Sequence, residues 1–158
     1  MLLLKGNHEQ MMEEFYFASN DWDTMQAWHQ WKRNGGDKTN QEVLKLESDD
    51  ADKLLNFVKG LPYYFIINVG GQKFLLTHAA VEIYKDVGVK KSLEHQIKNQ
   101  NIVWNRDEFY LSKNTSDMVM IHGHTPTVCL TQDENRCGIF YYNDRRRIDI
   151  DCGGVFGF

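Results

Sequence analysis

The chain of 158 residues is long enough to bury one hydrophobic core, and its 42% hydrophobic and 25% charged residues are ordinary for a globular domain. Its net charge of −4 and its pI near 5.8 argue against a nucleic-acid-binding surface. No stretch is long and apolar enough to predict a membrane-spanning helix, so we expect neither nucleic acid nor a membrane among its partners.

The first third of the sequence predicts one short strand followed by three helices. Residues 2–5, Leu-Leu-Leu-Lys, are typical of a short buried strand. Residues 9–18 and 23–33 carry apolar side chains at near-helical spacing, and Asn-Gly-Gly stops the second pattern. Residues 48–60 predict a third helix, because the opening Ser-Asp-Asp is typical of an N-cap.

The remainder of the sequence predicts strands with one helix between them. Residues 63–69 and 73–77 flank Gly70-Gly71, a pattern typical of a β-hairpin. Helices that come first and strands that follow them predict an α/β layered domain, in which sites gather at the carboxyl edge of a sheet. The other predicted elements are a helix at residues 93–100 and strands at residues 118–121, 127–131, 138–142 and 147–151.

Three polar clusters directly follow predicted apolar strands. They are Gly-Asn-His-Glu at residues 6–9, Thr-His-Ala-Ala at residues 77–80 and His-Gly-His-Thr-Pro at residues 122–126. Because loops at the ends of strands in one sheet can converge, Asn7, His78 and His124 can share one site. An amide oxygen and two imidazoles suit a borderline divalent metal such as Mn, Fe or Zn.

The three clusters resemble the later motifs of the calcineurin-like metallophosphoesterases, most closely those of the bacterial and phage phosphoprotein phosphatases. Residues 31–39, Trp-Lys-Arg-Asn-Gly-Gly-Asp-Lys-Thr, are similar to a helical insert of that branch. Trp104-Asn105-Arg106-Asp107 is similar to its Trp-x-Arg-Asp/Glu segment, and residues 150–157 are similar to its closing Ile-Asp-Thr-Gly-Ala-Val-Phe-Gly. Six motifs therefore occur in the family's order along essentially the whole chain.

The resemblance implies a role for five residues. Asn7, His78 and His124 would bind the second metal of a two-metal site, His8 would be the general acid, and Arg106 would bind the phosphate of the substrate. The implied cofactors are divalent ions, with Mn²⁺ expected and Fe or Zn as alternatives, two of them in the complete domain. Two cations about 3.5–4 Å apart polarise a phosphoryl group and lower the pKa of a bridging water. A guanidinium suits forked contact with phosphate oxygens.

The earlier motifs of that family, Gly-Asp-x-His-Gly and Gly-Asp-x-x-Asp-Arg-Gly, have no counterpart in this sequence. They supply the first-metal ligands, the Asp that bridges both metals and a second phosphate-binding Arg. The family usually continues with one more strand after the closing motif. We therefore expect residues 1–158 to be a single partial domain: a metallophosphoesterase-type β-sandwich flanked by helices, without its first strands and its last strand.

The function expected from the resemblance is metal-dependent hydrolysis of phosphoric monoesters, with phosphoserine and phosphothreonine in proteins as substrates. The same metals and the same His8 would also serve a dinucleoside tetraphosphate hydrolase, so the substrate can be a phosphoprotein or a phosphorylated small molecule. A third hypothesis is a catalytically inactive chain that acts as a binding module. The sequence leaves these alternatives open.

Two further expectations concern side chains outside the implied ligand set. His122 precedes the glycine of the third cluster, and we expect it to support the ligands or the structure rather than bind metal. The three cysteines, an odd number without Cys-x-x-Cys spacing, favour free thiols in a reducing compartment, so we expect a cytoplasmic protein. Cys152 stands where the family commonly has Thr, and we expect it to be a small buried residue.

Overall fold

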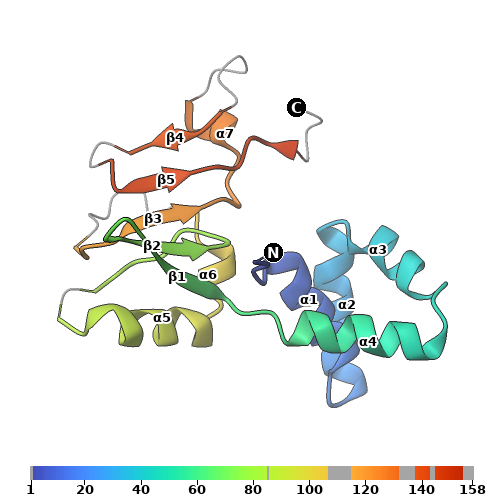
Figure 1. Ribbon diagram of the computed structural model, residues 1–158. Coiled ribbons are helices and arrows are strands. Elements are labelled where there is room, and N and C mark those ends of the chain that lie inside the picture. The colour runs from blue at the N-terminus through green and yellow to red at the C-terminus, as the bar shows by residue number, and fades with distance from the viewer. Residues whose placement is uncertain (1, 85, 107–114, 132–137, 143–144, 155–158) are drawn as a thin grey trace. The chain divides into compact units, whose positions relative to one another are not determined.

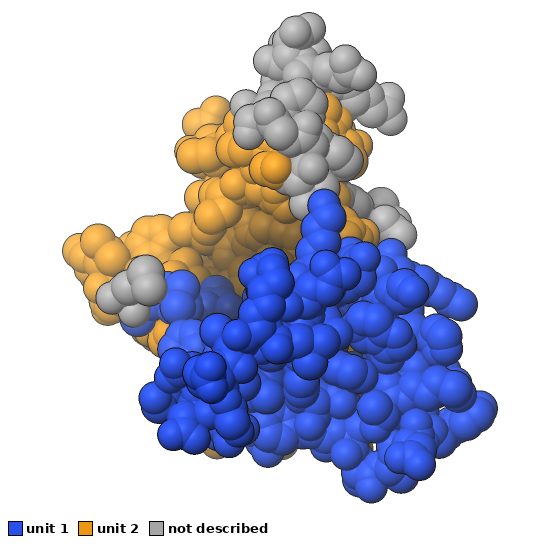
Figure 2. All heavy atoms as spheres, turned by 90° about the vertical axis from the view of Figure 1, so that its right-hand side faces the viewer, with its two compact units in different colours: residues 1–62 blue, residues 63–158 orange. Residues whose placement is uncertain are grey.

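The computed structural model describes residues 2–84, 86–106, 115–131, 138–142 and 145–154. The chain divides into two compact units, residues 1–62 and residues 63–158, which Figure 2 distinguishes by colour. Among the described residues, no helix has both the length and the apolar character that crossing a membrane requires.

Unit 1 consists of four helices (Figure 1). The three predicted helices are confirmed, but the strand predicted at residues 2–5 is wrong: this segment has no strand assignment, and Leu2 is 59% exposed. A further helix follows the second one. It was not predicted, because Gly35-Gly36 indicated only the end of a helix. The helices are α1 at Asn7–Tyr16, α2 at Asp21–Arg33, α3 at Gly36–Val43 and α4 at Ser48–Lys59.

The start of α2 is fixed by local hydrogen bonding, and the core of the unit is aromatic. The N-cap Asn20 accepts a hydrogen bond from the backbone N–H of Asp23 through its Oδ1 atom (2.9 Å). Trp31 is 1% exposed and packs against the rings of Phe15, Tyr16 and Trp28. α3 can lie against this ring only because Gly36 lacks a side chain: a Cβ there would come within 2.3 Å of Trp31.

Unit 2 is built on a five-stranded mixed sheet with the order β1-β2-β3-β5-β4 (Figure 1). The predicted hairpin is confirmed: β1 and β2 pair antiparallel, and Gly70 and Gly71 have φ values of 59° and 88°, which suit a two-residue hairpin turn. β3 pairs parallel to both β2 and β5, and β4 is antiparallel to β5. The strands are Tyr64–Val69, Gln72–Thr77, Val119–His122, Phe140–Tyr141 and Arg147–Asp149.

Among the described residues of unit 2, three helices accompany the sheet. α5 (Gly88–Lys98) and α6 (Asn101–Trp104) lie in the connection from β2 to β3, and α5 begins five residues before the predicted start. The strand predicted at residues 127–131 is wrong, because α7 (Thr127–Thr131) occupies it and β5 pairs with β3 instead. The buried hydrophobic core comprises Leu75, Ala80, Val81, Ile83, Leu93, Ile102, Val103, Met118, Met120 and Tyr142.

The α/β class is confirmed by this mixed sheet and its helices. In the part of the chain that the structure describes, the strands form one five-stranded sheet. The metallophosphoesterase-type β-sandwich therefore stays a prediction, and so does the single partial domain over residues 1–158.

Candidate functional site

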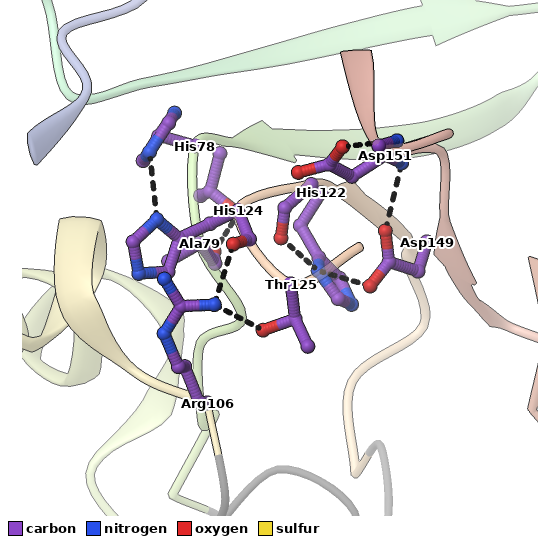
Figure 3. Close-up of polar contacts among 11 residues, drawn as sticks. His78, Ala79, Arg106, His122, His124, Thr125, Asp149 and Asp151 are labelled. Carbon is purple, nitrogen blue, oxygen red and sulfur yellow. Dashed lines mark hydrogen bonds and ion pairs between the residues drawn. The ribbon is translucent and has the colours of Figure 1, made fainter. Parts of the chain in front are cut away.

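Two histidines from different loops meet at the carboxyl ends of neighbouring strands. β2 and β3 run parallel, with Leu76 beside Ile121, so the loop after each strand emerges at the same edge of the sheet. His78 and His124 lie in these two loops, and His78 Nε2 is 3.1 Å from His124 Nδ1 (Figure 3). The structure thus brings together two residues that lie 46 positions apart in the chain.

Backbone hydrogen bonds hold the two loops against each other and against α6. The N–H of Gly123 donates to the carbonyl of His78 (2.9 Å), which fixes the spacing of the two histidines. The N–H of Ala79 donates to the carbonyl of Ile102 in α6 (3.2 Å). Within the first loop, Thr77 Oγ1 donates to the carbonyl of Ala79 (2.7 Å). The position of each imidazole therefore depends on tertiary contacts.

Arg106 and Trp104 complete the surroundings of His124. Arg106 Nη1 donates to the backbone carbonyl of His124 at 2.7 Å and reaches Thr125 Oγ1 at 3.5 Å (Figure 3). The Trp104 ring packs edge-on against the His124 ring, with centroids 5.9 Å apart. His124 itself is 8% exposed, and its φ of 70° is a left-handed conformation that residues other than glycine seldom adopt. The guanidinium of Arg106 thus lies beside the histidine pair.

The histidine pair has a geometry that fits a divalent cation. Two nitrogens that bind one ion at about 2.1 Å each lie about 3.0 Å apart at an octahedral right angle and about 3.4 Å apart at a tetrahedral angle. The separation of 3.1 Å between His78 Nε2 and His124 Nδ1, which is also that of a hydrogen bond between the two rings, lies within this range. Imidazole is also a ligand that Zn, Fe and related ions accept. No group of three or more His, Cys, Asp or Glu side chains suited to a metal occurs in the described parts of the chain.

His122 lies beside the pair in sequence but points into a separate buried contact. On β3 it is 3% exposed, and its Nδ1 lies 3.2 Å from the carbonyl of Gly123 and 3.8 Å from Asp149 Oδ2 (Figure 3). Burial lowers the pKa of His122 to about 4, and burial raises the pKa of Asp149 to about 7. Each group therefore favours its neutral form. This placement agrees with the expectation that His122 has a supporting role.

Sequence reasoning missed Asp149, the fully buried partner of His122. Its Oδ1 accepts a hydrogen bond from the N–H of Asp151 (2.9 Å), and Asp151 Oδ1 accepts one from the N–H of Gly153 (2.9 Å). The carbonyl of Asp151 also accepts from the N–H of Thr127, which ties the end of β5 to α7. The sequence carried no signal for this burial, because the alternation of residues 147–151 predicts the isoleucines to face inward, whereas the structure buries Arg147 and Asp149 and leaves Ile150 exposed.

Asn7 and His8 lie in unit 1, as the first two residues of α1. Gly6 is the N-cap residue, and its N–H donates to Glu9 Oε2 (3.0 Å), so the Gly-Asn-His-Glu cluster is a helix start rather than a loop. Asn7 is 7% exposed, whereas the His8 side chain is exposed. One pocket of this unit, about 280 Å³, is lined by Phe15, Asp21, Thr24, Met25, Trp28 and Asn40, none of which is a predicted site residue.

Two remaining expectations have different outcomes. Cys152 is exposed, so the expectation that it is buried is wrong; it follows the short strand β5, where the chain has left the sheet. Cys129 is exposed and is a free thiol, and Cys137 lies outside the described residues. Neither the comparison with protein-family models nor the comparison with curated proteins found a match for this chain. The implied roles of the site residues therefore enter below as proposals.

Proposed function

We propose that this protein hydrolyses phosphoric monoesters with the help of divalent metal ions, and that its substrates are phosphoserine and phosphothreonine in proteins. The observation that carries the proposal is the approach of His78 Nε2 to His124 Nδ1, at 3.1 Å, beside the guanidinium of Arg106. The order of the motifs around these residues, which resembles that of the phosphoprotein phosphatases, supports the same function.

In this proposal the chain contributes ligands from both units. His78, His124 and the side-chain oxygen of Asn7 would hold one divalent ion, with Mn²⁺ as the expected ion and Fe or Zn as alternatives. The meeting of Asn7 with the histidine pair belongs to the proposal, because the two units are described separately. When bound, the metal ions would polarise the phosphoryl group and lower the pKa of the water that attacks phosphorus.

His8 and Arg106 would act on the substrate directly. His8 would donate a proton to the leaving oxygen of the serine or threonine side chain, and its exposure suits access to a protein substrate. Its place in the first turn of α1 adds the partial positive charge of a helix N-terminus, which favours an anionic phosphate. Arg106 would bind phosphate oxygens, since a guanidinium carries five N–H donors and only Nη1 reaches His124 and Thr125.

Metal binding by the 158-residue chain tests the ligand assignment without requiring turnover. We expect the wild-type chain to bind Mn²⁺, measured from the loss of the free Mn²⁺ signal in electron paramagnetic resonance. Outer-shell partners of metal ligands contribute about 10–100-fold to affinity, so loss of a ligand in His124→Ala should weaken binding by about 100-fold or more. His95→Ala, which removes an exposed imidazole on α5, is the matched control and should bind like wild type. Equal Mn²⁺ affinity in wild type and His124→Ala would overturn the assignment.

Turnover measurements test the reaction and its substrate. We expect Mn²⁺-dependent release of phosphate from a phosphoserine peptide, and its loss in His8→Ala although this variant keeps the Mn²⁺ affinity of wild type. Faster hydrolysis of diadenosine tetraphosphate than of the peptide would replace the proposed substrate class by dinucleoside tetraphosphates. Tight Mn²⁺ binding without hydrolysis of either substrate would contradict an enzymatic function and favour the binding module.

A further inference from the structure

His124 has a backbone conformation that requires support. Among the described residues, only Gln100, His124 and Arg145 combine a side chain with a positive φ. A non-glycine residue in the left-handed region costs free energy and persists where its surroundings hold it, which is common at functional sites. Because His124 carries one nitrogen of the proposed metal pair, the contacts that hold its backbone also decide where that nitrogen lies.

One short segment, residues 101–106, supports both histidine loops. In α6, the carbonyl of Ile102 accepts the N–H of Ala79, directly after His78. Trp104 packs edge-on against the ring of His124, and Arg106 donates from Nη1 to the carbonyl of the same residue at 2.7 Å. On the other side of His124, the N–H of Gly123 is bonded to the His78 carbonyl. The peptide group after His124 is therefore anchored through its carbonyl, and the peptide group that precedes Gly123 is anchored through its N–H.

We propose that Arg106 is a positioning residue for His124: its hydrogen bond to the His124 carbonyl holds this residue in the left-handed conformation and so sets the metal affinity of the His78–His124 pair. The inference rests on the proposed function, in which the pair binds a divalent ion. In addition to the proposed contact with phosphate, Arg106 thus has a second role, the positioning of His124, which does not depend on bound substrate.

The charge of Arg106 and its hydrogen bond have opposite effects on metal affinity, so the direction of the change in a variant distinguishes them. A guanidinium near a dication repels it, so removal of the charge alone would strengthen metal binding. Loss of the hydrogen bond that fixes a ligand has the opposite effect, typically about 10–100-fold weaker binding. If a neutral substitution of Arg106 weakens Mn²⁺ binding, the cause is therefore the lost support of His124.

The experiment measures the dissociation constant of the full chain for Mn²⁺ alone, without phosphate. We expect Arg106→Met to raise this constant about tenfold or more. Arg106→Lys keeps an N–H donor of nearly the same reach and should stay within about threefold of wild type, while losing the forked contact with inorganic phosphate. The affinities for Mn²⁺ and for inorganic phosphate should therefore respond differently to this substitution. The lysine variant retains Mn²⁺ binding and binds inorganic phosphate more weakly in the presence of Mn²⁺.

Arg146→Met is the matched control. Arg146 also donates from Nη1 to a backbone carbonyl, that of Ser116 at 2.8 Å, but it precedes β5 at the end of the sheet opposite to the histidine loops. This substitution removes the same charge and the same type of hydrogen bond, and we expect no loss of Mn²⁺ affinity. Arg106 is exposed, so its variants are expected to fold, which circular dichroism checks. If Arg106→Met is unfolded, the same measurement is made on Arg106→Gln, whose amide is too short to reach the His124 carbonyl.

Four outcomes would overturn the proposal, and two of them concern the proposed function. Wild-type or tighter Mn²⁺ binding in Arg106→Met would leave Arg106 as a phosphate ligand only. An equal loss in Arg106→Lys and Arg106→Met would exclude the hydrogen bond as the cause. Absence of Mn²⁺ binding in the wild-type chain, or equal binding in His124→Ala, would overturn the metal site itself and this inference with it.

Discussion

The candidate residues of unit 2 are held by contacts between distant segments, whereas those of unit 1 are held by a single helical turn. His78 and His124 are 46 positions apart and are joined through parallel strands and the hydrogen bond from Gly123 to the His78 carbonyl. Asn7 and His8 are placed by the start of α1, where Glu9 accepts the N–H of Gly6. The histidine pair therefore exists only when its sheet is formed, whereas the start of α1 is defined by a hydrogen bond between residues three positions apart.

The largest expected effect tests whether the two units respond separately. Gly36→Ala places a methyl group within 2.3 Å of the buried Trp31 ring, and we expect overpacking of this severity to destabilise unit 1 by about 3 kcal/mol. Hydrogen exchange should show lost amide protection in α2 and α3, with β2 and β3 unchanged. Gly60→Ala, whose new methyl would lie 3.4 Å from its nearest neighbour, is the control in the same unit. Equal loss of protection in the sheet would contradict the separation of the units.

The next expected effect concerns the buried pair of unit 2, whose two members shift stability with pH in opposite directions. The pKa of His122 falls from 6.5 to about 4 on folding, so between these values the unfolded chain binds more protons and stability rises with pH. The pKa of Asp149 rises from 3.8 to about 7, so the folded chain binds more protons and stability falls with pH. At about pH 5 the pair carries one proton in both the folded and the unfolded chain. The opposite contributions of His122 and Asp149 to the pH dependence of stability therefore cancel.

Single substitutions should expose these opposite slopes. In Asp149→Asn only His122 remains, and the free energy of unfolding should rise by about 3 kcal/mol from pH 4 to 6.5 relative to wild type. In His122→Gln only Asp149 remains, and the free energy of unfolding should fall over pH 4 to 7. Urea unfolding in the presence of a chelator measures both. Parallel pH profiles of wild type and both variants would contradict this reading of the pair.

A smaller effect tests whether the two regions cooperate in one site. If the side-chain oxygen of Asn7 binds the same ion as the histidine pair, Asn7→Ala should raise the Mn²⁺ dissociation constant about tenfold. Asn56→Ala, on the exposed part of α4, is the control and should bind like wild type. Unchanged affinity in Asn7→Ala would mean that the pair in unit 2 binds without unit 1.

The smallest effect concerns the local hydrogen bonding at the helix start. Glu9→Gln keeps an acceptor for the Gly6 N–H but removes a negative charge from the first turn of α1, so we expect a loss of about 0.5 kcal/mol. Amide exchange of α1 measures this change, and Glu14→Gln, near the other end of the helix, is the control that should not destabilise it. Greater destabilisation by Glu14→Gln would contradict the capping role of Glu9.

Much of the fold could be predicted because the signals were local. The hairpin around Gly70-Gly71 and the helix α4 follow from turn chemistry and from apolar periodicity, and both are present. The strand predicted at residues 127–131 is wrong because a short apolar run is compatible with a helix as well as with a strand. β5, rather than this segment, pairs with β3. The strand expected at residues 2–5 failed because apolar residues form a strand only beside a partner, and this segment pairs with none of the described strands.

By itself, the sequence indicated which residue types stand after the predicted strands, and hence that Asn7, His78 and His124 are candidates for one site, to which the family resemblance added Arg106. Only the tertiary structure decided that two imidazole nitrogens approach within 3.1 Å, that Arg106 holds the carbonyl of a left-handed His124, and that Asp149 is the buried partner of His122. The physical reason is that strand pairing and burial depend on residues far apart in the chain. Such contacts leave no local pattern, whereas helices and tight turns are encoded within a few residues.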